Sequence, residues 1–138
     1  MNPDIQNDDE FEAIQSNWMK FENVGDNIIG TLTGTFDKEW GDDLPDQIIY
    51  QCVNCIVNGE VQDPTVEWNV GIKAKSQFVN SRMAKIKHGQ KFKIVFEKEI
   101  PPTKKGMNPA KSLTPYAGKM DNAYLQSKDV DDTFGKDF

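Results

Sequence analysis

The pattern of apolar and polar residues predicts that the first long strand begins near Trp18 and, after a turn, runs on to Phe36. From Ile28 onward every second residue is apolar or glycine, and the residues between them are mostly threonine. A period of two is typical of a half-buried strand. Two glycines on the apolar face, Gly30 and Gly34, suit a sharply coiled strand that closes a small barrel.

The rest of the pattern predicts three more long segments with a period of two, a short fifth strand, and one segment with a helical period. Asn58-Gly59 is a strong hairpin-turn signal, and Gly89 ends the helical stretch. The predicted elements after the first strand are strands over residues 47–57 and 65–72, a helix over 75–88, and strands over about 92–97 and 111–117.

This order of elements predicts a mostly β protein, a five-stranded OB-type Greek-key barrel with one helix between strands 3 and 4. An SH3-like barrel is the alternative. Residues 17–120 would form the OB-fold domain. The acidic segments 1–16 and 121–138 are expected to be mobile arms on either side of it.

Length and composition place the chain in a broad class. Its 138 residues supply one domain. No run of apolar residues is long enough to cross a membrane, and the acidic N-terminal segment lacks the apolar core of a signal peptide. Two cysteines, Cys52 and Cys55, give no disulfide framework. We therefore expect a soluble, cytoplasmic protein without a membrane partner.

Charge is strongly segregated along the sequence, although the net charge is only −6. Residues 1–72 hold 2 lysines and 15 acids, whereas residues 73–120 hold 12 lysines and arginines against two glutamates. Residues 121–138 are acidic again. A dense basic block of this kind is the pattern expected of a site for a polyanion, and a solvated lysine-rich face is the alternative reading.

Catalytic and metal-binding motifs are not apparent. Cys52 and Cys55 would point to opposite faces of a regular strand, and His88 is the only histidine, so a four-ligand zinc site is not expected. The acids of the loop Asp42, Asp43 and Asp46 lack the spacing of a calcium loop. No phosphate-binding glycine motif or nucleophile motif occurs. We expect neither an enzyme nor a cofactor.

In an OB barrel, ligands cross strands 2 and 3 between the loop joining strands 1 and 2 and the loop joining strands 4 and 5. Single-strand binders combine a cationic groove with aromatic platforms for the bases. The candidate nucleic-acid-binding residues are the aromatics Trp40, Tyr50 and Tyr116 and the cations Arg82, Lys91, Lys93, Lys104, Lys105 and Lys111.

Residues 18–120 resemble small phage-encoded OB-type proteins. The resemblance lies in Val24-Gly25-Asp26 near the start and in the segment from Pro101 to Ala110 near the end. It implies handling of single-stranded DNA during the replication or recombination of a phage or mobile element, in the host cytoplasm. It assigns no role to any single residue.

The end of the chain resembles the acidic, phenylalanine-terminated tails of bacterial and phage single-stranded-DNA-binding proteins. In those proteins the terminal aromatic docks on replication partners, and the acids compete with DNA for the basic groove. The residues that carry the resemblance here are Asp129, Asp131, Asp132, Phe134, Asp137 and Phe138. It implies partners among replication or recombination proteins.

The leading hypothesis is therefore sequence-independent binding of single-stranded DNA. A non-catalytic structural or assembly protein, in a virion or replisome, is the alternative. In that case the acidic first half of one chain would pair with the basic half of another, giving a homo-oligomer. An inhibitor that mimics DNA with its acidic arms is a third hypothesis. The choice between DNA and RNA and the oligomeric state stay open.

Overall fold

A computed structural model of the chain describes residues 17–106 and 109–127. These residues form a mostly β structure in which all seven described strands belong to one sheet. The expected acidic arm at residues 1–16 and the tail residues from 128 onward lie outside the described residues. The mostly β class predicted from the sequence is confirmed.

The elements in chain order are β1 (Asn17–Trp18), β2 (Asn27–Lys38), β3 (Gln47–Val57), β4 (Glu60–Val61), β5 (Trp68–Lys73), α2 (Gln77–Met83), β6 (Gln90–Ile100) and β7 (Ala110–Met120), with a further helical segment over 122–127. The strand order across the sheet is β1-β5-β3-β2-β6-β7, and β4 pairs with β3. All pairs are antiparallel except β1 with β5. Within the described ranges the sheet is open, with β1 and β7 at its edges.

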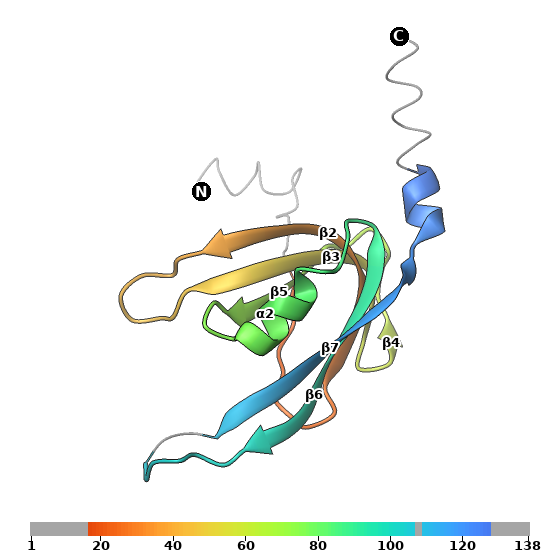
Figure 1. Cartoon of the computed structure of the whole chain (residues 1–138). Coiled ribbons are helices and arrows are strands. Elements are labelled where there is room, and N and C mark those ends of the chain that lie inside the picture. The colour runs from red at the N-terminus through yellow and green to blue at the C-terminus, as the bar shows by residue number, and fades with distance from the viewer. Residues whose placement is uncertain (1–16, 107–108, 128–138) are drawn as a thin grey trace, which may run out of the picture.

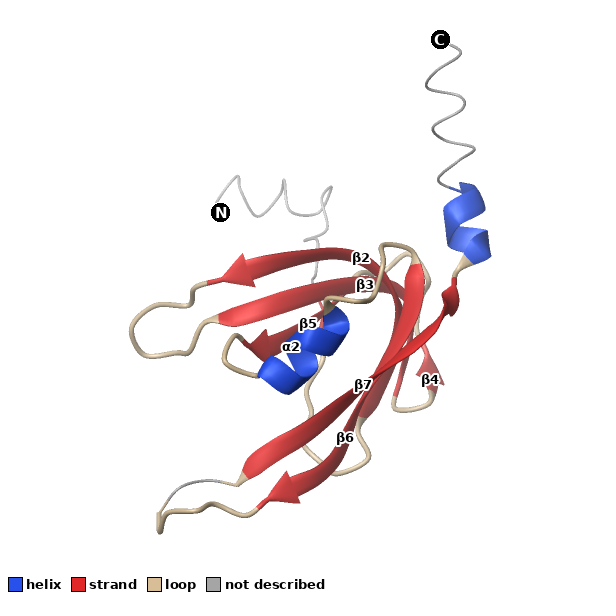
Figure 2. Ribbon diagram, viewed as in Figure 1, coloured by secondary structure: helices blue, strands red, loops and turns tan. Residues whose placement is uncertain are grey.

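Two long hairpins dominate the shape of the molecule. The β2–β3 hairpin and the β6–β7 hairpin diverge from a shared, strongly bent part of the sheet, and α2 lies in the concave space between them (Figures 1 and 2). In Figure 1 both hairpins extend toward the left of the view, so their tips lie on the same side of the body. The inner face of the sheet is the one turned toward α2, and the outer face is the opposite one.

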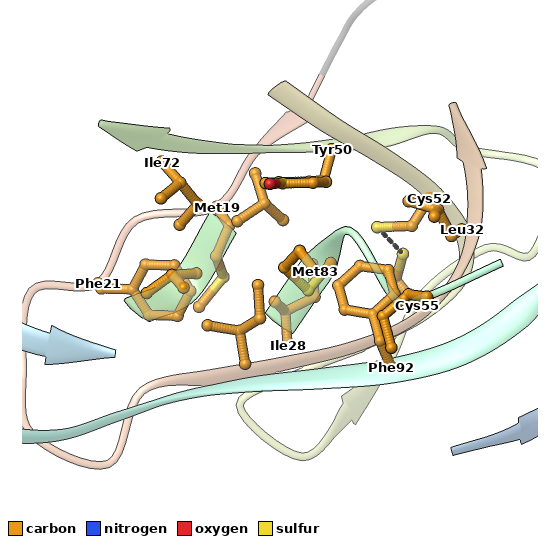
Figure 3. Close-up of a cluster of buried hydrophobic side chains, with 14 of the residues drawn as sticks. Met19, Phe21, Ile28, Leu32, Tyr50, Cys52, Cys55, Ile72, Met83 and Phe92 are labelled. Atoms are coloured by element: carbon orange, nitrogen blue, oxygen red, sulfur yellow. Dashed lines mark hydrogen bonds between the residues drawn. The ribbon is translucent and has the colours of Figure 1, made fainter. Parts of the chain in front are cut away.

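The core fills the space between the inner face and α2. Met83 of α2 lies among side chains from several strands (Figure 3). The buried cluster consists of Met19, Phe21, Ile28, Leu32, Tyr50, Cys52, Cys55, Val70, Ile72, Val79, Met83, Ile86, Phe92, Ile94 and Phe96. Burial of this apolar surface is the main favourable contribution to folding.

Two irregularities in the pairing of β2 with β3 change which side chains face inward. Leu32 pairs with Cys52 on the inner face, but the register then shifts, and Gly34 pairs with Gln51 on the outer face. Phe36 follows Gly34 onto the outer face and is 41% exposed. The expectation that Gly34 and Phe36 share the apolar face of Ile28 is therefore wrong. The cause is a bulge, which adds one residue to a strand and reverses the alternation beyond it.

A second bulge lies in β3 at Asn54, whose φ of 54° is in the left-handed region. Before it, alternate residues up to Cys52 point inward; after it, Cys55 points inward although it is three positions later. Opposite the bulge, Gly30 leaves room for both sulfur atoms. A Cβ at Gly30 would lie 2.9 Å from Cys52 Sγ and 3.2 Å from Cys55 Sγ.

The residue directly after β7 ties the end of that strand to the outer face of the sheet. Asp121 is buried, and its carboxylate accepts hydrogen bonds from Thr31 Oγ1 of β2 at 2.6 Å and from Asn54 Nδ2 of β3 at 3.1 Å. It also accepts one from the backbone N–H of Tyr124, which caps the helical segment 122–127. Ordered structure thus continues past Met120.

Candidate nucleic-acid interface

A strip of cations and one aromatic ring lies on the outer face of the β6–β7 hairpin. Lys93 and Tyr116 are cross-strand partners, and Lys91 lies two residues away on the same face. Tyr116 is 48% exposed, and its hydroxyl donates a hydrogen bond to Glu97, which fixes the ring on the sheet. The hydrogen bond with Glu97 raises the pKa of Tyr116. The structure therefore brings three of the predicted residues together.

The tip of the same hairpin carries Lys104 and Lys105. Both are exposed, in the turn that follows Pro101-Pro102. Neither lysine has a hydrogen-bond or ion-pair partner among the described residues. Their ammonium groups are free to meet an external anion.

Arg82 lies apart from this strip, on the exposed side of α2. Its guanidinium is 3.7 Å from the centre of the Phe78 ring, and it donates a hydrogen bond to the Phe78 carbonyl at 3.0 Å. Phe78 is 48% exposed. Sequence reasoning missed Phe78, although its place four residues before Arg82 on a helix was a usable signal.

Lys111, also in the predicted set, is exposed but already has a partner within the protein. Its ammonium donates a hydrogen bond to the backbone carbonyl of Phe21 and lies 5.8 Å from the centre of the buried Phe96 ring. The side chain thus ties the segment after β1 to β7. Because an ammonium group has three donors, this contact uses only part of its hydrogen-bonding capacity, and the role of Lys111 in binding stays a prediction.

Tyr50 is a correction to the predicted set. It is only 3% exposed, on the inner face, and its hydroxyl donates a hydrogen bond to Asn80 Oδ1 of α2 at 2.8 Å. Burial and the nearby charge of Asp37 raise its pKa to about 12. Its ring is packed in the core and cannot stack on a base. The even position 50 falls in the part of β3 before the bulge, where even-numbered residues point inward.

Trp40 is exposed, as expected, but in acidic surroundings. It lies between β2 and β3, where its ring contacts Trp18 edge-to-face at 5.8 Å between centres and its Nε1 donates to Gln47 Oε1 at 2.9 Å. Lys38 lies 5.1 Å from the ring centre. The surrounding loop, residues 39–46, holds four acids and no cation. The loop charge disfavours a phosphate at this ring.

The cysteine pair is a second correction. Cys52 and Cys55 do not point to opposite faces: both are fully buried, and their sulfur atoms are 3.5 Å apart as free thiols. The hydrogen bond between the thiols and their burial raise the pKa of Cys52. No cluster of three or more metal-ligating side chains occurs in the described part of the chain. The prediction assumed a regular strand, but the bulge at Asn54 adds one residue between the two cysteines and so turns both toward the core.

The predicted tail residues, Asp129, Asp131, Asp132, Phe134, Asp137 and Phe138, lie outside the described residues. The segment that leads to them is held in place. Leu125 packs against Gly89, and the Tyr124 hydroxyl is 2.9 Å from His88 Nε2. His88 therefore helps to anchor the helical segment 122–127.

No protein-family model, curated protein or solved structure matches this chain. In residues 17–106 and 109–127, no helix is both long and apolar enough to span a bilayer.

Proposed function

We propose that this protein binds single-stranded DNA without sequence preference, using the outer face and tip of the β6–β7 hairpin. The observation that carries the proposal is the exposed Lys93–Tyr116 pair with Lys91 beside it. The lysines would neutralise phosphates, and the Tyr116 ring would stack on a base, an interaction that adds about 1–3 kcal/mol per base.

The arrangement of the strands supports an OB-type fold. Without β1 and β4, the order is β5-β3-β2-β6-β7, and α2 comes between β5 and β6 in the chain. An OB barrel with its five strands numbered along the chain would have the order 3-2-1-4-5 along such a sheet. The loop between β6 and β7 would then be one of the two loops that contact ligands in OB folds. That loop carries Lys104 and Lys105.

The acidic end of the chain would regulate this site and recruit replication or recombination proteins, as its resemblance to phage and bacterial tails implies. The segment 122–127 runs beside the turn before β6, so the tail would start close to the basic hairpin. Removal of residues 128–138 should raise the affinity for DNA at low salt. The protein would act in the cytoplasm, that of the host if a phage encodes it.

The test is a fluorescence-anisotropy titration of the full chain with labelled oligo-dT at two salt concentrations. Each phosphate contact should contribute about −0.7 to the slope of log affinity against log salt. The double variant Lys91→Ala/Lys93→Ala should make the slope less steep, because fewer phosphates are contacted. Tyr116→Ala should weaken binding at both salt concentrations. Lys20→Ala/Lys75→Ala is the control, since it removes the same charge from other exposed positions.

Two results would reject the proposal. One is no binding to oligo-dT at low salt, even after removal of residues 128–138. The other is an equal loss of affinity in the control and in the Lys91/Lys93 variant, because that would mean only a diffuse charge effect. A matched oligo-U strand shows whether DNA or RNA is preferred.

A second candidate function, a structural or assembly protein, is favoured by a different observation. The exposed rings of Trp18 and Trp40 lie beside a loop with four acids. An aromatic surface with an acidic rim suits a basic protein segment better than a nucleic acid.

A further inference from the structure

The tip of the β2–β3 hairpin presents a small apolar hollow. It is lined by Trp40, Leu44, Pro45 and Gln47. Leu44 is 58% exposed and Trp40 is 40% exposed. Exposed apolar surface that gathers in one hollow is a feature of docking sites, whereas single exposed apolar residues are ordinary.

The rim of this hollow is strongly acidic. Glu39, Asp42, Asp43 and Asp46 all lie in the same loop. None of these carboxylates has an ion-pair partner within residues 17–106 and 109–127. The occupant that fits is therefore an apolar segment with positive charge beside it.

The tip of the other hairpin has this composition. Ile100, which is 45% exposed, is followed by Pro101-Pro102 and then by Lys104 and Lys105. Consecutive prolines hold the backbone extended and preformed, and such segments dock on aromatic-lined surfaces at low entropic cost. The lysines follow the prolines after one residue, Thr103, so positive charge lies directly beside the apolar part of the tip.

We propose that the hollow on the β2–β3 hairpin of one molecule receives the Ile100–Lys105 tip of a second copy of this chain. Both hairpins extend from the same side of the body (Figure 1). Two molecules facing each other across a two-fold axis can therefore make the contact twice, each giving one tip and receiving the other. Such a reciprocal contact closes on itself and yields a dimer rather than an open chain.

The contact engages Lys104 and Lys105, so at the tip it would compete with DNA, but it leaves Lys91, Lys93 and Tyr116 on the outer face open. It needs no nucleic acid, so its test is independent of the proposed function. Light scattering on the full chain, without DNA, should give twice the monomer mass of 15.7 kDa at low salt. The mass should fall toward that of the monomer as salt is raised, because the exposed charges are screened. Leu44→Ser should give the monomer mass even at low salt, since it removes the apolar part of the contact.

Charge reversal gives a sharper test. Asp42→Lys/Asp43→Lys/Asp46→Lys changes the charge of the loop 39–46 from −4 to +2, so both tips of that molecule are basic. Lys104→Glu/Lys105→Glu makes both tips of a molecule acidic. Each variant alone should be monomeric. An equimolar mixture of the two should form a heterodimer, because every contact in the mixed pair joins an acidic tip to a basic one. One chain with all five reversals should dimerise with itself.

The control is Lys85→Glu/Lys87→Glu, which reverses two exposed charges outside both hairpin tips and should leave the dimer intact. Circular dichroism checks that every variant is folded, as expected for changes at exposed positions. A monomer at low salt in the unmodified chain would overturn the proposal. So would a reversal variant that still dimerises alone, or a mixture of the two that stays monomeric.

Discussion

Asn54 donates a hydrogen bond to Asp121 across 67 positions of the chain, at 3.1 Å between Nδ2 and Oδ2. The bond joins the bulge of β3 to the residue that caps the helical segment 122–127. Thr31 of β2 donates to the same oxygen at 2.6 Å. The segment that leads to the C-terminal tail is thus held by two central strands.

Asp121→Ala should destabilise the fold by about 1–3 kcal/mol, because the polar groups of Thr31 and Asn54 lose a buried partner. Chemical denaturation measures the change. The control is Asn122→Ala, at the neighbouring exposed position. An equal effect of both substitutions would contradict a special role for the Asp121 carboxylate.

The Asp121 carboxylate should also make the free energy of unfolding depend on pH in the acidic range. Partial burial tends to raise the pKa of Asp121, but hydrogen bonds from Thr31, the Tyr124 N–H and Asn54 and the charge of Lys91 lower it overall. Its contribution is therefore present above the unfolded-state pKa of about 3.9 and is lost as the pH falls through the lower folded-state value. Asp121→Asn should lose less stability than the unmodified chain between about pH 5 and pH 2. Denaturation curves across that range provide the comparison.

Gly30→Ala should destabilise the protein by about 1–3 kcal/mol, because the added methyl group meets two buried sulfur atoms in a packed core. Gly34→Ala is the matched control in the same strand. There the methyl group would meet only the end of the Gln51 side chain, at 2.9 Å from Oε1, and that amide lies on the outer face and can move. Thermal melts of both variants should show the larger loss at Gly30.

Tyr50→Phe should cost about 0.5–1.5 kcal/mol of stability through loss of the hydrogen bond to Asn80, and should leave DNA binding unchanged. Because the folded state raises the pKa of Tyr50 to about 12, the contribution of Tyr50 is present at neutral pH and is lost as the pH rises from 10 to 12. A melt series at alkaline pH should therefore show a weaker decline for Tyr50→Phe. Weakened DNA binding in this variant would instead restore Tyr50 to the interface.

The thiols of Cys52 and Cys55 should react with Ellman's reagent only after unfolding. Both side chains are fully buried, and the raised pKa of Cys52 keeps that thiol protonated, whereas the thiolate is the reactive form. Two thiols per chain should appear in denaturant and almost none without it. Fast reaction of the folded protein would show that the core opens readily at this point.

The positions of the strands and the helix were predicted better from the sequence than the direction, inward or outward, in which their side chains point. The strand expected at residues 47–57 has those bounds in the structure, and Asn58-Gly59 adopts the positive φ values of a hairpin turn. A period of two and an Asn-Gly pair are local signals, so they can be read without tertiary information. The predicted helix over 75–88 is shorter, at Gln77–Met83.

The candidate interface was predicted less well, because its geometry depends on register and on distant contacts. The bulge that turns Phe36 outward depends on the pairing of two strands and leaves no simple mark in the sequence. The contact of Lys111 with the carbonyl of Phe21 joins positions 90 apart. The helical segment 122–127 was read as part of a polar tail, since its anchors on His88 and Gly89 come from the fold.

The bulge at Asn54 also makes β3 unusually sensitive to the number of its residues. On one side of Asn54 the even-numbered residues face the core, and on the other side the odd-numbered ones do. Substitution of Asn54 would disturb the left-handed backbone at this position and remove the hydrogen bond to Asp121. Deletion of that single residue would restore plain alternation and keep Cys52, Cys55 and Val57 on the core face. A straight strand that kept Asn54 would instead bring Ile56 into the core in place of Cys55 and Val57, and so put one half of the strand out of phase with the other.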